Sequence, residues 1–297
     1  MKIVIQLFCF PHQIDELENT LNQLKRSSNY IDKSKEWHLD VCMCISDDMV
    51  NWNKSSLPKK YFEDRLMKLS WQTDWCFKNF RTSSEIKGVV SHKRLCLKEH
   101  EHTQYFIWMN VNLIFDEKTL SYLENALQPA WDITPMNIIT PELVKMWDTS
   151  WDCLVNENFI DKKLGYQKLS DPYKDSGIKD KVTLEKVENL EVPQSRFKFA
   201  GGWFTCISGR LLRKIGIPES FGHHGFEDTF VMIASEKLVK TKKEDIQQFK
   251  LKNLVICENF KYTNNGHYLN NLTVYDRREE FEKQAESNFM KELEKIN

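Results

Sequence analysis

The chain has 297 residues, of which 41% are hydrophobic and 29% are charged, a composition typical of a soluble globular protein of enzyme size. Its 42 Lys and Arg residues nearly balance 43 Asp and Glu residues, so the net charge of −1 provides no overall positive field to attract nucleic acid or an anionic membrane. The amino-terminal apolar run is too short for a signal peptide, and no stretch reaches the roughly 18 apolar residues of a membrane span. We therefore expect a cytoplasmic protein with no transmembrane segment.

The eight cysteines lie mostly inside apolar runs, and no two of them form a CxxC pair. A zinc finger would need such pairs together with further ligands at set spacing. We therefore expect the cysteines to be small buried side chains in a protein of a reducing compartment. They are Cys9, Cys42, Cys44, Cys76, Cys96, Cys153, Cys206 and Cys257.

The first 115 residues alternate between predicted strands and predicted helices. The β-branched and aromatic run 2–10 predicts a buried strand that ends at Pro11, and apolar residues at helical spacing predict a helix over 14–27. Further strands are predicted over 37–48 and 105–115, with a helix over 83–100 between them. This alternation predicts an α/β fold with a mostly parallel, twisted sheet, helices on both faces, and a ligand crevice at the carboxyl ends of the strands.

Polar residues lie at the ends of two of these predicted strands. Asp47 and Asp48 could hold the ribose or base edge of a nucleotide, or they could cap the next turn. Asn110 and Asn112 lie one residue apart and so on the same side of an extended chain. They are the remnant of a metal site, a metal site of unusual composition, or a polar turn.

The rest of the chain has a weaker pattern. A helix that opens with acids is predicted over 116–128, and 131–144 predicts an apolar edge segment. The polar excursion 147–192 predicts loops and short helices, which either serve as a lid or an acceptor-binding wall or are mobile. The basic run 237–252 is interpreted as a solvated helix face or loop, and 278–297 as a charged amphipathic helix. We expect one domain, with a nucleotide-sugar-binding half over 1–130, an acceptor-binding half over 131–275 and a C-terminal helix over 276–297.

A second informative stretch runs from 197 to 238. Gly201 and Gly202 precede a predicted strand and would let a ligand approach the backbone. A loop rich in Gly and His, including His224, then leads to a helix whose first turn contains Glu227 and Asp228. Acids there stabilise a helix by roughly 0.3–1 kcal/mol, but a carboxylate that projects into a ligand site could also deprotonate an acceptor hydroxyl. The predicted buried face of this helix consists of Phe226, Phe230, Ile233 and Ala234.

The order of these motifs resembles glycosyltransferases of the GT-A fold, over most of the chain from Lys2 to about Leu269. In that family a D-x-D motif at a strand end binds a divalent ion that bridges the diphosphate of a nucleotide sugar, and the matching residues here are Asn110 and Asn112. The family's acidic pair at the head of a helix matches Glu227 and Asp228. The resemblance implies that Asp228 is the base of an inverting reaction and that Glu227 orients donor or acceptor.

The resemblance also implies roles for residues outside these two motifs. The family's late histidine, often a metal ligand, is best matched by His267, so that Asn112 and His267 form a candidate metal pair. The loop 8–12 resembles the one that surrounds the nucleotide base, and Trp203 is either a stacking platform for a sugar or a core aromatic. The candidate acceptor- or sugar-binding residues are Gly201, Gly202, Trp203 and His224, and the candidate donor-binding residues are Phe8, Pro11, Asp47, Asp48, Lys87, Arg94, Asn110 and Asn112.

The amides depart from the family's pattern in charge. Mg²⁺ and Mn²⁺ favour carboxylate oxygens, and an Asn carbonyl brings no negative charge, so two Asn residues should weaken metal binding. Three outcomes are open. The ion is held mostly by the diphosphate, His267 and another acid; or metal is dispensable and Lys87, Lys93 or Arg94 neutralises the diphosphate; or the protein is not catalytic.

We expect a glycosyltransferase that moves a sugar from a nucleotide-diphosphate donor to a hydroxyl of a glycan or other acceptor, with Mn²⁺ or Mg²⁺ as an open requirement. One alternative is a sugar-nucleotide- or glycan-binding protein that kept the fold without the chemistry. Another is a transferase that acts on modified nucleic-acid bases and docks through the run 237–252, which the net charge does not favour.

Overall fold

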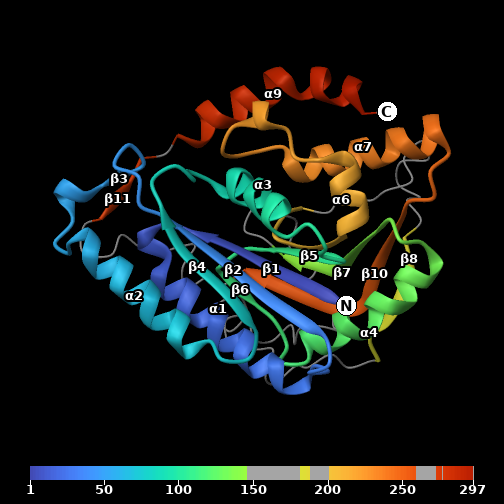
Figure 1. The fold of residues 1–297 in the computed structure, drawn as a ribbon, viewed down its shortest axis with the longest axis horizontal. Coiled ribbons are helices and arrows are strands. Elements are labelled where there is room, and N and C mark those ends of the chain that lie inside the picture. Colours follow the sequence, from blue (N-terminus) through green and yellow to red (C-terminus); the bar gives the residue numbers. More distant parts are fainter. Residues whose placement is uncertain (146–180, 188–200, 259–271, 276, 297) are drawn as a thin grey trace, which may run out of the picture.

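The computed structural model describes residues 1–145, 181–187, 201–258, 272–275 and 277–296 (Figure 1). The predicted excursion 147–192 therefore lies almost entirely outside the described residues. In chain order the main elements are β1 (Lys2–Cys9), α1 (Ile14–Ser27), β2 (Glu36–Cys44), β3 (Val50–Asn51), α2 (Lys59–Gln72), β4 (Phe77–Ser83), α3 (Val89–Glu99), β5 (Tyr105–Met109), β6 (Leu113–Ile114), α4 (Thr119–Ile133), β7 (Asn137–Lys145), β8 (Thr183–Lys186), β9 (Phe204–Ser208), α6 (Gly209–Ile215), α7 (Glu227–Lys242), β10 (Gln247–Glu258), β11 (Thr273–Val274) and α9 (Arg278–Lys295).

One mixed sheet organises the described chain. Its strand order is β4-β2-β1-β5-β9-β7-β10-β6, with β8 paired to β10, while β3 and β11 form a separate two-stranded ribbon. The strands β4, β2, β1 and β5 pair in parallel, as do β7 and β10. Strand β9 is antiparallel to both of its neighbours, and β6 and β8 are antiparallel to β10. The expected α/β sheet is confirmed as mostly parallel by strand direction, with these antiparallel insertions.

Helices cover both faces of this sheet (Figure 1), which explains why its central strands are apolar on both sides. The odd-numbered positions of β1, such as Ile3 and Ile5, belong to a core shared with α1, α2 and α4. Val4 of the same strand faces the opposite way and belongs to a second core with Phe106, Trp108 and the helices α6 and α7. The period of two along a strand thus divides one apolar run between two cores.

Several predicted elements differ from those observed. The segment 131–144 is not an edge, because β7 lies between β9 and β10 inside the sheet. The basic run 237–252 is divided between the end of α7 and the start of β10, and the acids at 116–117 precede α4 instead of opening it. Ile233 was wrongly placed on the buried face of α7, since it is 41% exposed while Val231 and Leu238 pack inward. No element was predicted over helix α2 or strand β4, and the start of β10 lies in the run that was interpreted as a solvated helix face or loop, although Phe249 and Leu251 are buried there.

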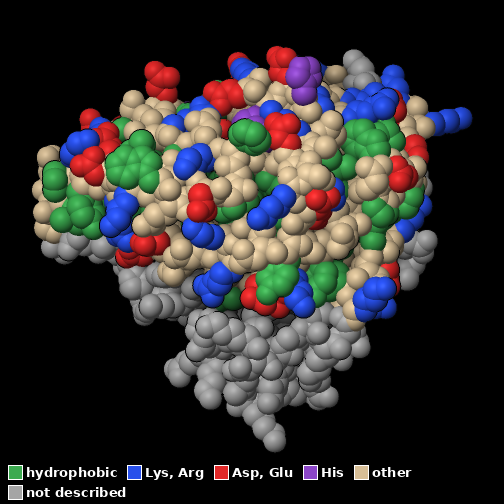
Figure 2. Space-filling view, turned by 60° about the horizontal axis from the view of Figure 1, so that its bottom comes forward, with side chains coloured by type: hydrophobic (Ala, Val, Ile, Leu, Met, Phe, Trp, Pro, Cys, Tyr) green, Lys and Arg blue, Asp and Glu red, His purple; other side chains and the backbone are tan. Residues whose placement is uncertain are grey.

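The cysteine prediction holds for the buried side chains of Cys9, Cys42, Cys44, Cys96 and Cys206, while Cys76 is partly buried. These six are free thiols. Within the described residues, no helix combines the length and apolarity needed to cross a membrane. The face shown in Figure 2 has acidic and basic side chains interspersed over the described surface, in keeping with the near-zero net charge.

Candidate active site

Asn110 and the Gly-Gly-Trp turn lie side by side at the carboxyl end of β5. Strand β5 ends at Met109, directly before Asn110, and pairs there with Phe204 at the start of β9. The backbone N–H of Asn110 donates to the carbonyl of Trp203 at 2.9 Å, which continues this antiparallel pairing by one residue. Residues 93 positions apart in the chain (203 − 110) therefore meet because β9 inserts next to β5.

The acidic pair contacts the same turn. Helix α7 begins at Glu227 after Phe226, which holds a left-handed backbone conformation (φ 64°), and the Gly202 N–H donates to Oδ2 of Asp228 at 2.8 Å. The other carboxylate oxygen of Asp228 accepts from the N–H of Thr229 at 2.6 Å. Burial, together with the neighbouring Glu227 carboxylate, raises the pKa of Asp228 above 3.8, although these hydrogen bonds and Lys93 oppose the shift.

A buried ion pair lies beneath this carboxylate. Lys93 Nζ of α3 is 2.5 Å from Oε1 of Glu227, and the two side chains are only 3% and 7% exposed. The same ammonium lies 4.1 Å from the centroid of the Trp108 ring on β5. The pair joins α3, β5 and α7. Asp228, in contrast, accepts its hydrogen bonds from Gly202 and Thr229, neither of which carries a charge.

The loop before α7 is held against α3. The N–H of Val90 donates to the carbonyl of His223 at 3.0 Å, and Gly88 approaches that carbonyl so closely that an added Cβ would lie 2.2 Å from its oxygen. Burial lowers the pKa of His224 to about 4, so this ring is neutral near pH 7. His224 Nε2 is 3.6 Å from Glu282 of α9.

A second cluster of polar side chains lies after the carboxyl end of β2. Asp48 accepts hydrogen bonds from Lys87 and Ser46, and it lies 3.0 Å from Arg277, just before α9. The bond from Lys87, supported by Ser46, lowers the pKa of Asp48 to about 2, so Asp48 is ionised throughout the neutral range. Asp47 points outward, with its side chain 83% exposed. The structure therefore brings together the predicted donor-binding residues Asp48 and Lys87.

Three further predicted donor-binding residues lie in two places, Phe8 and Pro11 around the end of β1 and Arg94 on α3. Phe8 lies on β1 with its ring 6.3 Å from that of His92, and Pro11 is buried in the turn that follows. Arg94 has its guanidinium hydrogen-bonded to the carbonyls of Ile217, Pro218 and Gly222. A donor-binding role for Arg94 stays a prediction, and these contacts show that it anchors the loop before α7.

Only some of the candidate metal ligands at the strand ends belong to the described residues. His267 lies outside the described residues, and the two amide side chains are neutral ligands. In the part of the chain that the structure describes, the clusters of His, Cys, Asp and Glu side chains close enough to share an ion are centred on Asp40 and include neither Glu227 nor Asp228. The two amides by themselves therefore bring no negative charge to an ion at the strand ends.

Sequence reasoning did not find the parts that depend on long-range contact. It listed Lys93 as a possible partner of a diphosphate, but not its pairing with Glu227, 134 residues away. Arg277 and Trp108 were not singled out at all. The only signal for Trp108 was its place in a strand that leads to the amides, and nothing in the local sequence around Arg277 points to Asp48.

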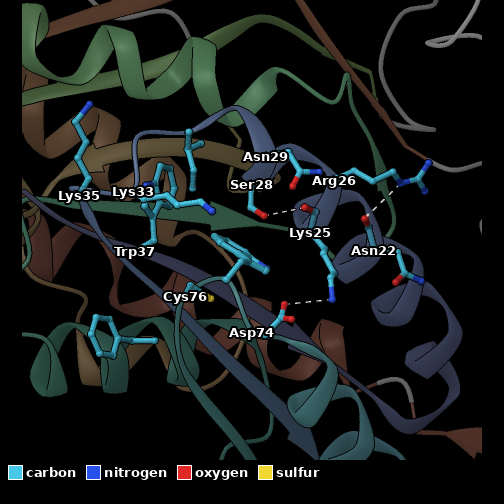
Figure 3. A pocket seen from close by; sticks show the side chains of 13 residues that line it. Asn22, Lys25, Arg26, Ser28, Asn29, Lys33, Lys35, Trp37, Asp74 and Cys76 are labelled. Atoms are coloured by element: carbon cyan, nitrogen blue, oxygen red, sulfur yellow. Dashed lines mark hydrogen bonds and ion pairs between the residues drawn. The ribbon is translucent and has the colours of Figure 1, made fainter.

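A cavity of about 1000 Å³ lies elsewhere (Figure 3). Trp37, the second residue of β2, lines it, so the cavity is at the opposite end of the parallel strands from Asn110. Lys25 and Asp74 face each other across it with a 3.2 Å ion pair. Lys33, Lys35 and Arg26 add further positive charge to its lining. This cavity is separate from the strand-end site.

Gly202 is placed where a side chain would disturb the acidic pair. A Cβ at this position would lie 2.6 Å from Lys93 Nζ and 3.3 Å from Glu227 Oε1. We expect Gly202→Ala to destabilise the fold by about 1–3 kcal/mol through this overpacking, measured by urea unfolding. The cost should shrink when the substitution is made in a Lys93→Met background, because the ammonium is then absent; equal costs in both backgrounds would contradict this placement.

No protein-family model matches the chain, and no curated protein matches it in sequence. Among solved structures it is similar to the mannosyltransferase PcManGT from Pyrobaculum calidifontis in complex with GDP-Man and Mn²⁺, with a TM-score of 0.52 and 11% identity over 89% of this chain and 58% of that one. Weaker likenesses are to S. aureus TarS 1-349 in complex with UDP-GlcNAc (TM-score 0.47, 12% identity, 84% and 58% covered) and to GalNAc-T7 with UDP, GalNAc and Mn²⁺ (0.47, 10%, 87% and 43%). The chain thus spans less than two thirds of each of these structures. The likeness to the mannosyltransferase confirms the fold that the motif order implied.

Proposed function

We propose that this chain, which has the fold of GT-A-type glycosyltransferases, transfers a sugar from a nucleotide-diphosphate donor to an acceptor hydroxyl. The observation that carries the proposal is the convergence of Asn110, Gly202 and Asp228 at the strand ends, with a carboxylate of raised pKa at the head of a helix. A base for a hydroxyl needs such a carboxylate within reach of the site where a ligand enters. Partial burial of Asp228, in contrast to the buried Glu227, fits that role.

In the proposed reaction Asp228 accepts the proton of the acceptor hydroxyl as that oxygen attacks the anomeric carbon, and the nucleoside diphosphate leaves. This direct displacement inverts the anomeric configuration. Glu227 does not act as a second base, because its carboxylate is engaged by Lys93. The Lys93–Glu227 pair instead holds the first turn of α7 against α3 and β5, and so fixes the direction of Asp228.

The donor diphosphate is proposed to lie over Asn110 and Asn112, beside the ring of Phe8 and the Asp48–Lys87 pair. A GT-A donor usually brings a divalent ion, which neutralises the leaving diphosphate when bound. Since the two amides are neutral, the diphosphate itself would supply most of the negative charge that holds the ion. The steps assigned to Asp228 and Glu227 do not depend on it.

The direct test is a thermal-shift and hydrolysis screen of purified protein with UDP- and GDP-sugars, each with and without Mn²⁺. We expect at least one nucleotide sugar to raise the melting temperature and to be hydrolysed slowly in the absence of acceptor. No stabilisation by any donor, under either metal condition, would contradict the proposed function.

A second candidate is a sugar-nucleotide-binding protein without transferase activity, and the observation that favours it is the pair of amides at Asn110 and Asn112. The same screen separates the two functions. Stabilisation by a nucleotide sugar with no hydrolysis, and no transfer to any hydroxyl acceptor, would favour the binding protein.

The amides also permit a metal prediction. We expect the double substitution Asn110→Asp with Asn112→Asp to tighten Mn²⁺ binding by about 10-fold or more, because each carboxylate adds a negative hard ligand. Isothermal titration with Mn²⁺ in the presence of the nucleoside diphosphate measures this directly. An unchanged affinity would show that these side chains do not face the ion.

The raised pKa of Asp228 predicts the acid side of the pH profile. A general base must be ionised, so the transfer rate should fall as the pH falls through this pKa, and the midpoint should lie above the ordinary value of 3.8. The measurement is kcat/KM against pH for the donor found in the screen. A rate that stays constant down to pH 4 would argue against Asp228 as the base.

A further inference from the structure

The face of the sheet beneath α3 contains a polar cluster that the strand-end site does not use. Asp40 lies in the middle of β2, and His92 and Cys96 lie one turn apart on α3, so that both side chains reach the same strand. All three are at most 1% exposed. Ionisable and thiol side chains that are buried so completely need a partner that balances their polarity.

The ligand atoms of this cluster lie slightly closer together than those of a metal site. His92 Nε2 is 2.8 Å from Oδ1 of Asp40 and 3.3 Å from Sγ of Cys96, and the three atoms all lie within 4.8 Å of one another. In a tetrahedral zinc site the nitrogen–oxygen and nitrogen–sulfur edges are about 3.3 and 3.6 Å, given ordinary zinc–ligand bond lengths. Outward shifts of a few tenths of an ångström would admit the ion.

The two carboxylate oxygens of Asp40 have different surroundings, as is common for carboxylates that bind a metal. Its Oδ2 is held by Asn79 at 3.0 Å, Arg81 at 3.0 Å and His100 at 3.2 Å. Its Oδ1 faces Nε2 of His92 at 2.8 Å. Outer hydrogen bonds of this kind orient a ligand and leave its other oxygen for the metal.

The charges of the side chains around the cluster, and those of an ion with its ligands, also balance. The guanidinium of Arg81 is paired with the carboxylate of Glu99 as well as with Asp40. A divalent ion bound at this cluster would displace the proton of the Cys96 thiol. A zinc ion with the Asp40 carboxylate and the Cys96 thiolate is then neutral overall.

A buried amide supplies an independent indication. Gln6 of β1 pairs with Asp40 in the parallel register, so the two side chains share one face of the sheet, and it lies against Cys96. Gln6 is 3% exposed and its amide faces the Cys96 thiol, but within the described part of the chain no nitrogen or oxygen atom pairs with its Oε1 or Nε2. An ion, or a water bound to an ion, would satisfy this amide and complete a fourth ligand position.

We propose that Asp40, His92 and Cys96, completed by Gln6 or a water that it holds, form a buried Zn²⁺ site that joins β2 to α3. The thiolate favours zinc over the hard ions that a nucleotide diphosphate binds, which separates this site from the one at the strand ends. Binding breaks the Cys96 S–H bond, forms a zinc–sulfur bond and releases one proton to solvent, with no change in oxidation state. The inference does not rest on the proposed glycosyltransferase activity. Because the next residue along α3 is Lys93, the ion would also fix the helix that holds Glu227.

The experiment uses the full chain purified without a metal-affinity tag, treated with a chelator and then equilibrated with Zn²⁺ or Co²⁺. Elemental analysis should find about one zinc per chain, and the cobalt form should show the near-ultraviolet charge-transfer band of a thiolate ligand. Cys96→Ser should lose this band, whereas Cys206→Ser, which removes an equally buried thiol from β9, should keep it.

A wild-type chain that retains no zinc, or a cobalt form without a thiolate band, would overturn the proposal. If Cys96→Ser does not fold, His92→Gln provides the second variant, with a cobalt band that is shifted or weakened as its expected result. A band unchanged in His92→Gln would equally overturn the assignment of these ligands.

Discussion

Replacing Asp228 by Asn is expected to lower the rate of sugar transfer by about 10²–10⁴-fold, the usual contribution of a general base, while donor affinity changes little. Asn has nearly the same shape, and its side-chain oxygen can still accept from the Gly202 N–H that holds Asp228 now at 2.8 Å. The substitution therefore removes the proton acceptor without removing the contact that positions it. Initial transfer rates and donor titrations on the same preparation separate the two effects.

The matched control is Asp64→Asn, which changes an exposed carboxylate of α2 that pairs with Lys60 on the surface. This variant should transfer sugar at the wild-type rate. If Asp228→Asn is as active as Asp64→Asn, the proton of the acceptor goes elsewhere and Asp228 is only a cap of the Gly202 turn. If Asp228→Asn loses donor binding as well as transfer, its role is in the donor site.

Breaking the Lys93–Glu227 pair is expected to destabilise the fold by about 3–5 kcal/mol, because each single substitution leaves a buried charge without its partner. The relevant variants are Lys93→Met and Glu227→Gln, and the atoms concerned are 2.5 Å apart in a site where the two side chains are 3% and 7% exposed. Urea unfolding followed by circular dichroism gives the free energy of each variant. The double variant Lys93→Met with Glu227→Leu should recover much of the loss, since it leaves no unpaired charge.

The comparison pair lies on the surface. Lys60→Met breaks an ion pair whose side chains are 74% and 62% exposed, and it should cost roughly 0–1 kcal/mol. If Lys93→Met costs no more than Lys60→Met, water reaches the buried pair and its positioning role fails. Loss of transfer in a Lys93→Met variant that is still folded would support the view that the pair directs the first turn of α7.

The sequence predicted the strand, helix and turn of the candidate site more successfully than the contacts between them. The strand before Asn110, the helix that begins at Glu227 and the turn at Gly202 were all predicted in nearly their observed places. Each of these depends on local signals: a short apolar run, acids at a helix start, or glycines before a strand. The placement of Ile233 on the buried face of α7 was wrong because helical spacing alone does not show which neighbours cover the helix.

The tertiary structure decided how these pieces meet. Strand β9 lies antiparallel between β5 and β7, against the expectation of simple parallel alternation, and this insertion brings Trp203 to Asn110. The pairing of Lys93 with Glu227 then follows from the packing of α3 and α7 over the same face.

By itself the sequence determined the strands, the helix starts and the chemical types of the candidate site, since these depend on residues within a few positions of one another. Only the tertiary structure decided which charges are paired, which carboxylate of the acidic pair has no lysine partner, and that Asp40, His92 and Cys96 share one buried space. These relations join residues tens to hundreds of positions apart, and they depend on which apolar faces bury one another across the whole sheet. Local sequence patterns do not predict which of these faces pack together.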